Sequence, residues 1–478
     1  MNQLNEKEIK YKKCIRCKQV DSETKFCETC FSKYCEKKYG KCFECKQVNT
    51  QKEWCQICNS KRFQQNFGNW TSGNDDIDKL IQNTQLTARN RYQVLEWIPY
   101  DRFYNIKYVA KGGFGKVYSA IWKDGFILLW DKYKNQLQRY AKVQVALKSL
   151  NESQNITLEF ISEITSYLKI HENEYIRNVI KCHGISQDPI TKEYIIVTNY
   201  ARNGNLQSAL KLKRYKIYNT SEEALLRLWI NKLYILSDIS SGLNGIHDKE
   251  LIHRDLHVGN IVSDKISCIT DMGLCKPANY DELEDKKYGV LPYMAPEILR
   301  GGNYTQASDI YSLGIIMYLI ISGLPPYYNV AQDEFLALNI CQGLRPKFDT
   351  TKVPQLIVYL FKRCLDANPL NRPRAKELAR IFRQWIKEIR SHKKSKSELV
   401  EQIEELNNSL SATSNPPLTN KMIHSEDSTY KSRALKFNNL PEPKNSDDYY
   451  ESSDNIIKYS EYFLKFSNDD CLECAITD

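Results

Sequence analysis

One ordered series of short motifs constrains the fold of this 478-residue chain more than any other feature. A Gly-rich turn between two β-rich stretches precedes a strand with one lysine, a helix with one glutamate, and three compact polar motifs. Each element alone is common in unrelated proteins, but chance does not explain all of them in this order and spacing. In chain order they are Tyr108–Tyr118, Val145–Lys148, Glu163, His253-Arg-Asp255 with Asn260, Asp271-Met-Gly273 and Ala295-Pro-Glu297.

The series resembles the eukaryotic protein kinase superfamily over about 290 residues of the chain. The local sequences of residues 112–118 and of Asn203-Gly-Asn-Leu206 are most similar to those of the tyrosine-kinase-like group of this superfamily. The resemblance implies an α+β, bilobal protein-kinase fold over residues 101–390, with a β-rich N-lobe and a helical C-lobe. It also implies transfer of the γ-phosphate of ATP to protein hydroxyls in intracellular signalling, with protein substrates as partners.

Catalysis in such a site consists of positioning and charge neutralisation around the transferring phosphoryl group. The resemblance implies that Asp255 accepts the proton of the substrate hydroxyl and that Lys148 contacts the α- and β-phosphates and pairs with Glu163. Asn260 and Asp271 would hold Mg²⁺, which prefers oxygen ligands. The other positions implied to bind ATP are Gly112, Gly113, Gly115, Val117, Ala146, Thr198 and Tyr200.

Three departures from the family pattern affect the nucleotide site. Ala110 replaces the first glycine of the turn, which predicts somewhat weaker nucleotide binding. Met272 replaces the Phe of the Asp-Phe-Gly triplet, a packing role that a flexible Met can serve. The interval between Gly115 and Lys148 exceeds that of a simple hairpin, so we expect a surface insertion at Lys123–Gln144.

Further matches concern architecture. Glu297 and Arg372 resemble the ion pair that ties the activation segment to the helical lobe. Asp309 and Gly314 resemble the central helix that anchors the catalytic loop. Thr198 stands where the family's gatekeeper residue would lie.

The residues that usually distinguish Ser/Thr from Tyr kinases leave substrate specificity open. His257 stands where Ser/Thr kinases usually carry Lys, and Val258 and Gly259 do not supply the Arg of tyrosine kinases. Val290 replaces the family's Thr. Group resemblance favours Ser/Thr or dual specificity. The alternative is a catalytically weak pseudokinase scaffold, against which the complete set of catalytic residues argues.

The segment Asp271–Glu297 contains no Ser and no Thr, so its activation cannot use phosphorylation of those residues. Tyr280, Tyr288 and Tyr293 remain, and we expect Tyr293 to be structural. Arg254 would ordinarily neutralise a loop phosphate. We expect loop carboxylates to serve instead, from Asp281, Glu282, Glu284 or Asp285.

Nine of the sixteen cysteines lie within residues 14–58, and eight of them form CxxC pairs. The second four repeat the first four at an offset of 28 residues. Four thiolates in two such pairs suit a tetrahedral Zn²⁺ site, and segments this short need a metal to fold. All four ligand positions are filled, which predicts structural zinc. The ligands are Cys14, Cys17, Cys27 and Cys30, then Cys42, Cys45, Cys55 and Cys58.

We interpret residues 1–66 as two consecutive zinc-ribbon-like repeats, with a cross-braced pairing of the four CxxC pairs as the alternative. Disulfides are disfavoured in a reducing compartment. The segment holds 15 Lys and Arg against 8 Asp and Glu, and two thiolate sites would lower its net charge to about +3. Only Arg16 and Arg62 are arginines, so nucleic-acid binding is disfavoured. A protein partner is the remaining expectation.

The rest of the chain is expected to flank the kinase domain. Residues 67–100 are interpreted as a linker with a short helix at Asp75–Thr87, for which docking on the next domain is favoured over simple linkage. Residues 391–478 are expected to form a short helix at Ser397–Leu410 and then a disordered tail, rich in polar residues from Ser411 onward.

Neither a membrane anchor nor a signal peptide is expected. The longest apolar run, Ile310–Gly323, is shorter than the ~18 residues needed to cross a bilayer. The first residues, Met1–Lys13, lack the apolar stretch of a signal peptide. We therefore expect a cytoplasmic protein, with the nucleus as the open alternative and no membrane partner.

Overall fold

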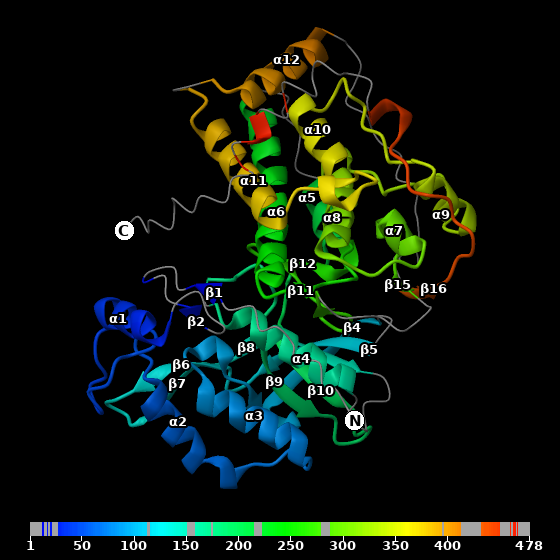
Figure 1. The fold of residues 1–478 in the computed structure, drawn as a ribbon. Helices are drawn as coiled ribbons and strands as arrows, with labels where there is room; N and C mark the ends of the chain where they lie inside the picture. Colours follow the sequence, from blue (N-terminus) through cyan, green and yellow to red (C-terminus); the bar gives the residue numbers. More distant parts are fainter. Residues whose placement is uncertain are drawn as a thin grey trace.

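The computed structural model is shown in Figure 1. It describes residues 12–13, 17, 20–21, 27–111, 115–150, 158–173, 175–214, 222–278, 287–393, 396–412, 432–449, 459, 462–464 and 466.

The N-lobe is built on a six-stranded sheet in the order β3-β9-β10-β8-β5-β4. β3 runs parallel to β9, whereas the other neighbours are antiparallel. Val145 and Leu147 alternate along β8 and are both buried, as one face of a half-buried strand requires. The strands are β3 (Glu96–Trp97), β4 (Phe103–Lys111), β5 (Gly115–Trp122), β8 (Val143–Leu150), β9 (Cys182–Gln187) and β10 (Tyr194–Asn199).

Helix α4 (Leu158–His171) accompanies this sheet, and its buried residues Phe160 and Ile164 join the same core cluster as Ile185 of β9. α4 carries Glu163, so the packing of this helix decides where that carboxylate lies. The helix that the sequence predicts around Glu163 is thus confirmed.

The C-lobe is helical and centres on α6 and α8 (Figure 1). Thr305 and Ser308 cap the start of α8 reciprocally, and Gly323 ends it with a φ of 71°, a left-handed conformation that favours glycine. The helices are α5 (Leu206–Arg214), α6 (Glu222–His247), α7 (Pro296–Leu299), α8 (Gln306–Ser322), α9 (Glu334–Cys341), α10 (Gln355–Cys364), α11 (Ala375–Arg390) and α12 (Glu398–Ala412).

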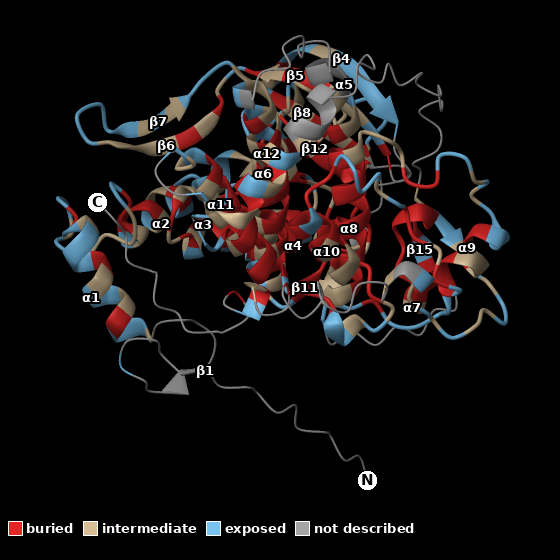
Figure 2. Cartoon of the chain, turned by 90° about the horizontal axis from the view of Figure 1, so that it is seen from above, coloured by how far each residue is buried: buried red, intermediate tan, exposed pale blue. Residues whose placement is uncertain are grey.

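Short antiparallel strand pairs frame the region between the lobes. They are β11 (Leu251–Ile252) with β14 (Lys276–Pro277), and β12 (Ile261–Ser263) with β13 (Ser267–Ile269). Figure 2 shows buried residues concentrated in the packed helices of the molecule and exposed ones on α1 and β7. The predicted α+β, bilobal class is confirmed. Among the described residues, no helix combines the length and apolarity needed to span a membrane.

The N-terminal segment forms a two-stranded pair and three helices: β1 (Lys12–Lys13), β2 (Val20–Asp21), α1 (Glu28–Tyr39), α2 (Gln56–Gln65) and α3 (Asp75–Thr87). The predicted bounds of α3 are confirmed, and the Asn74 side chain caps its start. Ile77 and Ile81 are fully buried in the core cluster that contains α4.

Residues 67–100 therefore do more than connect two domains, in line with the favoured docking of their helix. α3 docks on the N-lobe, and β3 adds a strand to its sheet. The ion pair between Arg139 and Glu96 (2.7 Å) is mostly shielded from solvent and ties β3 to the inserted hairpin.

The insertion at Lys123–Gln144 forms a hairpin of β6 (Phe126–Asp131) and β7 (Gln136–Tyr140). It is not only a surface feature. Ile127 is buried in a cluster with Trp54, Phe63, Ala88 and Val94 of the N-terminal segment. The Arg62 guanidinium lies 3.8 Å from the centre of the Trp130 ring, within cation–π range. The hairpin thus joins the cysteine-rich segment to the N-lobe sheet.

The expected disorder after residue 411 does not extend to residues 432–449, which we call the docked tail. Its Leu435, Phe437 and Leu440 pack against the C-lobe core, and β16 (Arg433–Leu435) pairs with β15 (Lys287–Gly289). Farther on, Phe463 is buried and stacks on Tyr359. A few spaced apolar residues dock these stretches despite their polar composition.

Candidate functional site

The centre of the candidate active site is a lysine held between two carboxylates. Lys148 on β8 lies 2.8 Å from Glu163 Oε1 and 2.8 Å from Asp271 Oδ1 through its Nζ. Glu163 comes from α4, and Asp271 follows β13. Three distant parts of the sequence therefore meet, as their implied roles require.

Burial and charge oppose each other in this cluster. Burial disfavours the charged form of Lys148, but the negative charges of Asp271 and Glu163 outweigh it and raise the pKa of the ammonium group. Burial also works against the ionised form of Asp271, yet the charge and hydrogen bond of Lys148 lower the pKa of its carboxyl group. Both groups are thus charged at neutral pH.

The backbone of Asp271 has a φ of 65°, which is uncommon for a residue with a side chain. Its N–H donates to the Tyr167 hydroxyl at 3.0 Å, and the Gly273 N–H donates to its Oδ1 at 3.3 Å. Tyr167 of α4 was not singled out from the sequence, where it is one of 31 tyrosines. Only its position one helical turn after Glu163 could have suggested a role.

The catalytic loop places Asp255 beside Asn260. The Asn260 Nδ2 donates to the Asp255 backbone oxygen at 2.9 Å and approaches Oδ2 at 3.3 Å. The Thr270 N–H donates to the Asn260 backbone oxygen at 2.9 Å, which brings Asp271 within one residue of this loop. The buried His257 accepts a bond from the Gly259 N–H, and its Nε2 lies 3.7 Å from Asp255 Oδ2.

Asp309 of α8 anchors this loop from below. Its carboxylate accepts the backbone N–H groups of His253 (2.8 Å) and Arg254 (3.0 Å), and it lies 2.9 Å from His247 Nε2. Arg254 has a φ of 72°, so these bonds hold a backbone conformation that a non-glycine residue rarely adopts. The predicted anchoring role of Asp309 is confirmed. Gly314 approaches Leu365 and Cys364 too closely for a side chain.

The residues expected to contact the adenine lie on the paired strands β5, β8 and β10. Val117 lies opposite Lys148, and Ala146 lies opposite Thr198 near the end of β10. Gly115 begins β5, and Tyr200 follows β10 directly. Gly112 and Gly113 lie outside the described residues.

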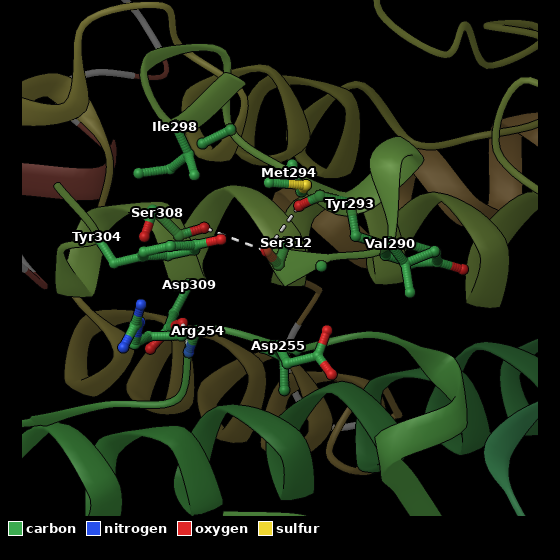
Figure 3. Close-up of a pocket in the computed structure, with 13 residues that line it drawn as sticks. Arg254, Asp255, Val290, Tyr293, Met294, Ile298, Tyr304, Ser308, Asp309 and Ser312 are labelled. Carbon is green, nitrogen blue, oxygen red and sulfur yellow. Dashed lines mark hydrogen bonds between the residues drawn. The ribbon is translucent and has the colours of Figure 1, made fainter. Parts of the chain in front are cut away.

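The activation segment, residues 271–297, borders a pocket that also contains Asp255 (Figure 3). Gly289, Val290 and Tyr293 line this pocket, and Figure 3 shows Val290 across from Asp255. Met272 is fully buried, consistent with the expected packing role. The proposed loop carboxylates, residues 281–285, and Tyr280 lie outside the described residues.

Two contacts hold the C-terminal part of this segment in place. The predicted ion pair is confirmed: Arg372 Nη1 and Nη2 lie 2.7 and 2.8 Å from the two Glu297 oxygens. The Arg254 guanidinium lies 4.6 Å from the centre of the Tyr304 ring, and the Tyr304 hydroxyl donates to the Tyr288 backbone oxygen at 2.6 Å. The catalytic loop is therefore linked to β15.

The cysteines of the N-terminal segment converge in two separate sets. The sulfur atoms of Cys42, Cys45, Cys55 and Cys58 all lie within 4.8 Å of one another. The sulfurs of Cys42 and Cys58 are 3.8 Å apart, and those of Cys45 and Cys55 are 3.5 Å apart. Tetrahedral zinc with Zn–S bonds of ~2.3 Å separates its sulfurs by about 3.8 Å, so the set fits this ion. These separations are too long for disulfides.

The first set is described in part. The sulfurs of Cys17, Cys27 and Cys30 meet the same criterion, with 3.6 Å between Cys17 and Cys27, while Cys14 lies outside the described residues. Each set comes from one repeat, so the CxxC pairs combine consecutively along the chain and are not cross-braced. Cys35 is buried apart from both sets, with its thiol 3.7 Å from the Thr50 backbone oxygen.

The fold and site have the arrangement typical of the protein-kinase class: a lysine paired with a glutamate and an aspartate, and a loop aspartate beside an asparagine. The family described as protein tyrosine and serine/threonine kinase matches residues 104–382. The chain belongs to the protein kinase family, which confirms the superfamily predicted from its motifs.

Curated relatives include kinases named for both specificities. A probable serine/threonine-protein kinase of Dictyostelium discoideum is 27% identical over 281 residues, covering 57% of this chain and 19% of the relative. Serine/threonine-protein kinase STY17 of Arabidopsis thaliana is 25% identical over 52% of this chain and 42% of its own. Tyrosine-protein kinase Src64B of Drosophila melanogaster is 26% identical over 62% and 48%. The chain thus spans less than half the length of these relatives.

Proposed function

We propose that this protein is an active protein kinase that transfers the γ-phosphate of ATP to protein hydroxyls in intracellular signalling. One observation carries the proposal: Lys148 lies within 2.8 Å of both Glu163 and Asp271. This arrangement brings the phosphate-binding cation and a Mg²⁺ ligand to one place. A pseudokinase scaffold would not need Lys148, Glu163, Asp255, Asn260 and Asp271 all to be retained.

The residues divide the work of phosphoryl transfer. Lys148 would bind the α- and β-phosphates, with Glu163 holding its ammonium group in position. Asn260 and Asp271 would hold Mg²⁺, which supplies charge neutralisation at the phosphates when bound. Asp255 would accept the proton of the substrate hydroxyl. Gly112, Gly113, Gly115, Val117, Ala146, Thr198 and Tyr200 would complete the nucleotide site.

Ser/Thr or dual specificity is the preferred assignment. It is supported by the serine/threonine kinases among the relatives, while the named tyrosine kinase and the His257 substitution leave the tyrosine alternative in play. Cytoplasmic action fits a protein whose clustered cysteines are reduced.

The two cysteine sets would hold structural Zn²⁺, with Cys14, Cys17, Cys27 and Cys30 in one site and Cys42, Cys45, Cys55 and Cys58 in the other. Four thiolates leave no open position for a substrate, which assigns the ion a role in stability. The exposed side of this segment, including Phe43 and Ile57, is available to a protein partner.

The test compares the wild type with Lys148→Met on separate Ser, Thr and Tyr peptides, with γ-labelled ATP and Mg²⁺. We expect transfer by the wild type, with Ser or Thr peptides preferred, and loss of transfer in the variant. A wild type that binds ATP but labels no acceptor would refute the enzyme assignment.

A further inference from the structure

The docked tail adds a strand to the activation segment. Arg433, Ala434 and Leu435 of β16 pair antiparallel with Gly289, Tyr288 and Lys287 of β15. Residues separated by about 145 positions in the sequence thus form one ladder, seen in Figure 1 beside α7 and α9. Such an added strand fixes its register through the main chain and carries its side chains to defined positions.

The ladder ends at the pocket that contains the proposed base. Gly289 forms the last pair of the ladder and also lines this pocket together with Val290 and Asp255. Because the strands are antiparallel, the tail residue before Arg433 lies in the direction in which the activation segment continues from Gly289 to Val290. That residue is Ser432.

The Ser432 hydroxyl oxygen is shielded from solvent and has no hydrogen-bond partner among the described residues. Buried hydroxyl groups normally have a partner, so this one needs an explanation. Ser432 comes one residue before Arg433, whose partner Gly289 lines the pocket of Asp255, so a hydroxyl there that is free of competing bonds could serve as a phosphoryl acceptor.

β16 and the part of the docked tail that follows it are anchored to the C-lobe by hydrogen bonds. The Arg433 guanidinium donates to the Gln332 backbone oxygen at 2.6 Å, and the Lys444 N–H donates to the Cys341 backbone oxygen at 2.9 Å. Asn445 Oδ1 accepts the Ala367 N–H at 2.6 Å, and the Tyr449 hydroxyl bonds to the Asp366 carboxylate. These bonds hold the strand at the site at a high effective concentration.

We propose that Ser432 is an intramolecular phosphorylation site of this kinase, an inference that rests on the proposed function. The Ser432 Oγ attacks the γ-phosphorus of ATP, and a new P–O bond forms. The bond from the γ-phosphorus to the oxygen bridging the β-phosphate breaks, and ADP leaves with that electron pair. The hydroxyl proton passes to Asp255. The products are phosphoserine, ADP and one proton.

The pairing of β16 also affects external substrates. While β16 is paired, the edge of β15 that it occupies is closed to any other peptide strand. A phosphate on Ser432 would carry about two negative charges at neutral pH, at the end of the ladder that points toward the pocket of Asp255. Repulsion would then favour release of β16 from β15.

The experiment uses the full zinc-loaded chain with Mg²⁺ and γ-labelled ATP, alone and with an external acceptor peptide. Phosphopeptides are located by mass spectrometry in the wild type, Ser432→Ala, Asp255→Asn and the matched control Ser446→Ala, which lies in the same docked tail. We expect label on Ser432 at a fractional rate independent of enzyme concentration. The label persists in Ser446→Ala, disappears in Ser432→Ala and falls by about 10²- to 10⁴-fold in Asp255→Asn.

Two results would overturn the inference and leave the proposed function standing. One is transfer to the external peptide while Ser432 remains unmodified. The other concerns a mixture in which Asp255→Asn supplies Ser432 as the acceptor and Ser432→Ala is the active enzyme. Labelling of Ser432 in this mixture as fast as in the wild type would make the reaction intermolecular. Transfer to no acceptor at all would overturn both proposals. Peptide phosphorylation by Ser432→Ala shows that this variant is folded.

Discussion

If the inserted hairpin stabilises the protein by packing against the cysteine-rich segment, truncating its buried side chain should lower the stability measurably. Ile127 of β6 is 3% exposed and lies among Trp54, Phe63, Ala88 and Val94, most of which come from the cysteine-rich segment and its connection. Replacing a buried isoleucine with alanine costs about 2–5 kcal/mol through lost burial and the cavity left behind.

We expect Ile127→Ala to cost about 2–3 kcal/mol, since the cluster is small and can collapse in part. In a kinase domain of about 290 residues, that corresponds to a melting temperature lower by roughly 3–5 °C. Scanning calorimetry of the full chain measures the change. Limited proteolysis in parallel should show earlier cleavage between the cysteine-rich segment and the N-lobe.

The matched control is Tyr133→Ala, at the turn of the same hairpin, where the side chain is 87% exposed. Surface substitutions of this kind usually change stability by less than about 0.5 kcal/mol. If the two variants melt at the same temperature, the hairpin does not depend on this cluster, and the reasoning fails.

The buried ion pair, the bound metal and a buried histidine should each affect activity or stability. Glu163→Gln leaves Lys148 with one carboxylate and should cost about 2 kcal/mol and at least about tenfold in transfer rate, and an unchanged rate would contradict the positioning role. Chelation of zinc should lower the melting temperature; absence of bound zinc in purified protein would refute this. Burial, with the charge of Lys181, lowers the pKa of His183 to about 3, so the unfolded chain binds a proton that the fold does not. The free energy of unfolding should therefore fall as pH drops below about 6.5. Urea titrations should show that His183→Gln reduces the slope of this free energy against pH, between pH 6 and 4, by about 1.4 kcal/mol per pH unit. An unaltered slope would contradict the assigned pKa.

The sequence predicted the structure best where a short motif or a helix cap requires a particular residue type. Asp309, Glu297 and Arg372 could be assigned because motifs placed them, and the helix at Asp75–Thr87 could be bounded by its cap and apolar spacing. Each of these signals is contained within a short window of sequence.

The contacts that the sequence did not predict join distant segments. Ile127 meets Trp54 and Phe63 across more than 60 residues, and no local pattern specifies that partner. In the tail, Leu435 and Phe437 are diluted by polar neighbours, so average composition suggested disorder although a few apolar anchors and main-chain pairing suffice for docking. Tyr167 acts through its hydroxyl group and Tyr304 through its hydroxyl group and its ring, contacts that composition does not distinguish.

The most direct test of the central claim is a single-turnover measurement of γ-phosphate transfer to a peptide by the wild type and Asp255→Asn, with ATP affinity measured on both proteins. The account predicts similar affinities and a transfer rate about 10²- to 10⁴-fold lower in the variant. Equal rates in the two proteins, or ATP binding without transfer by the wild type, would contradict it.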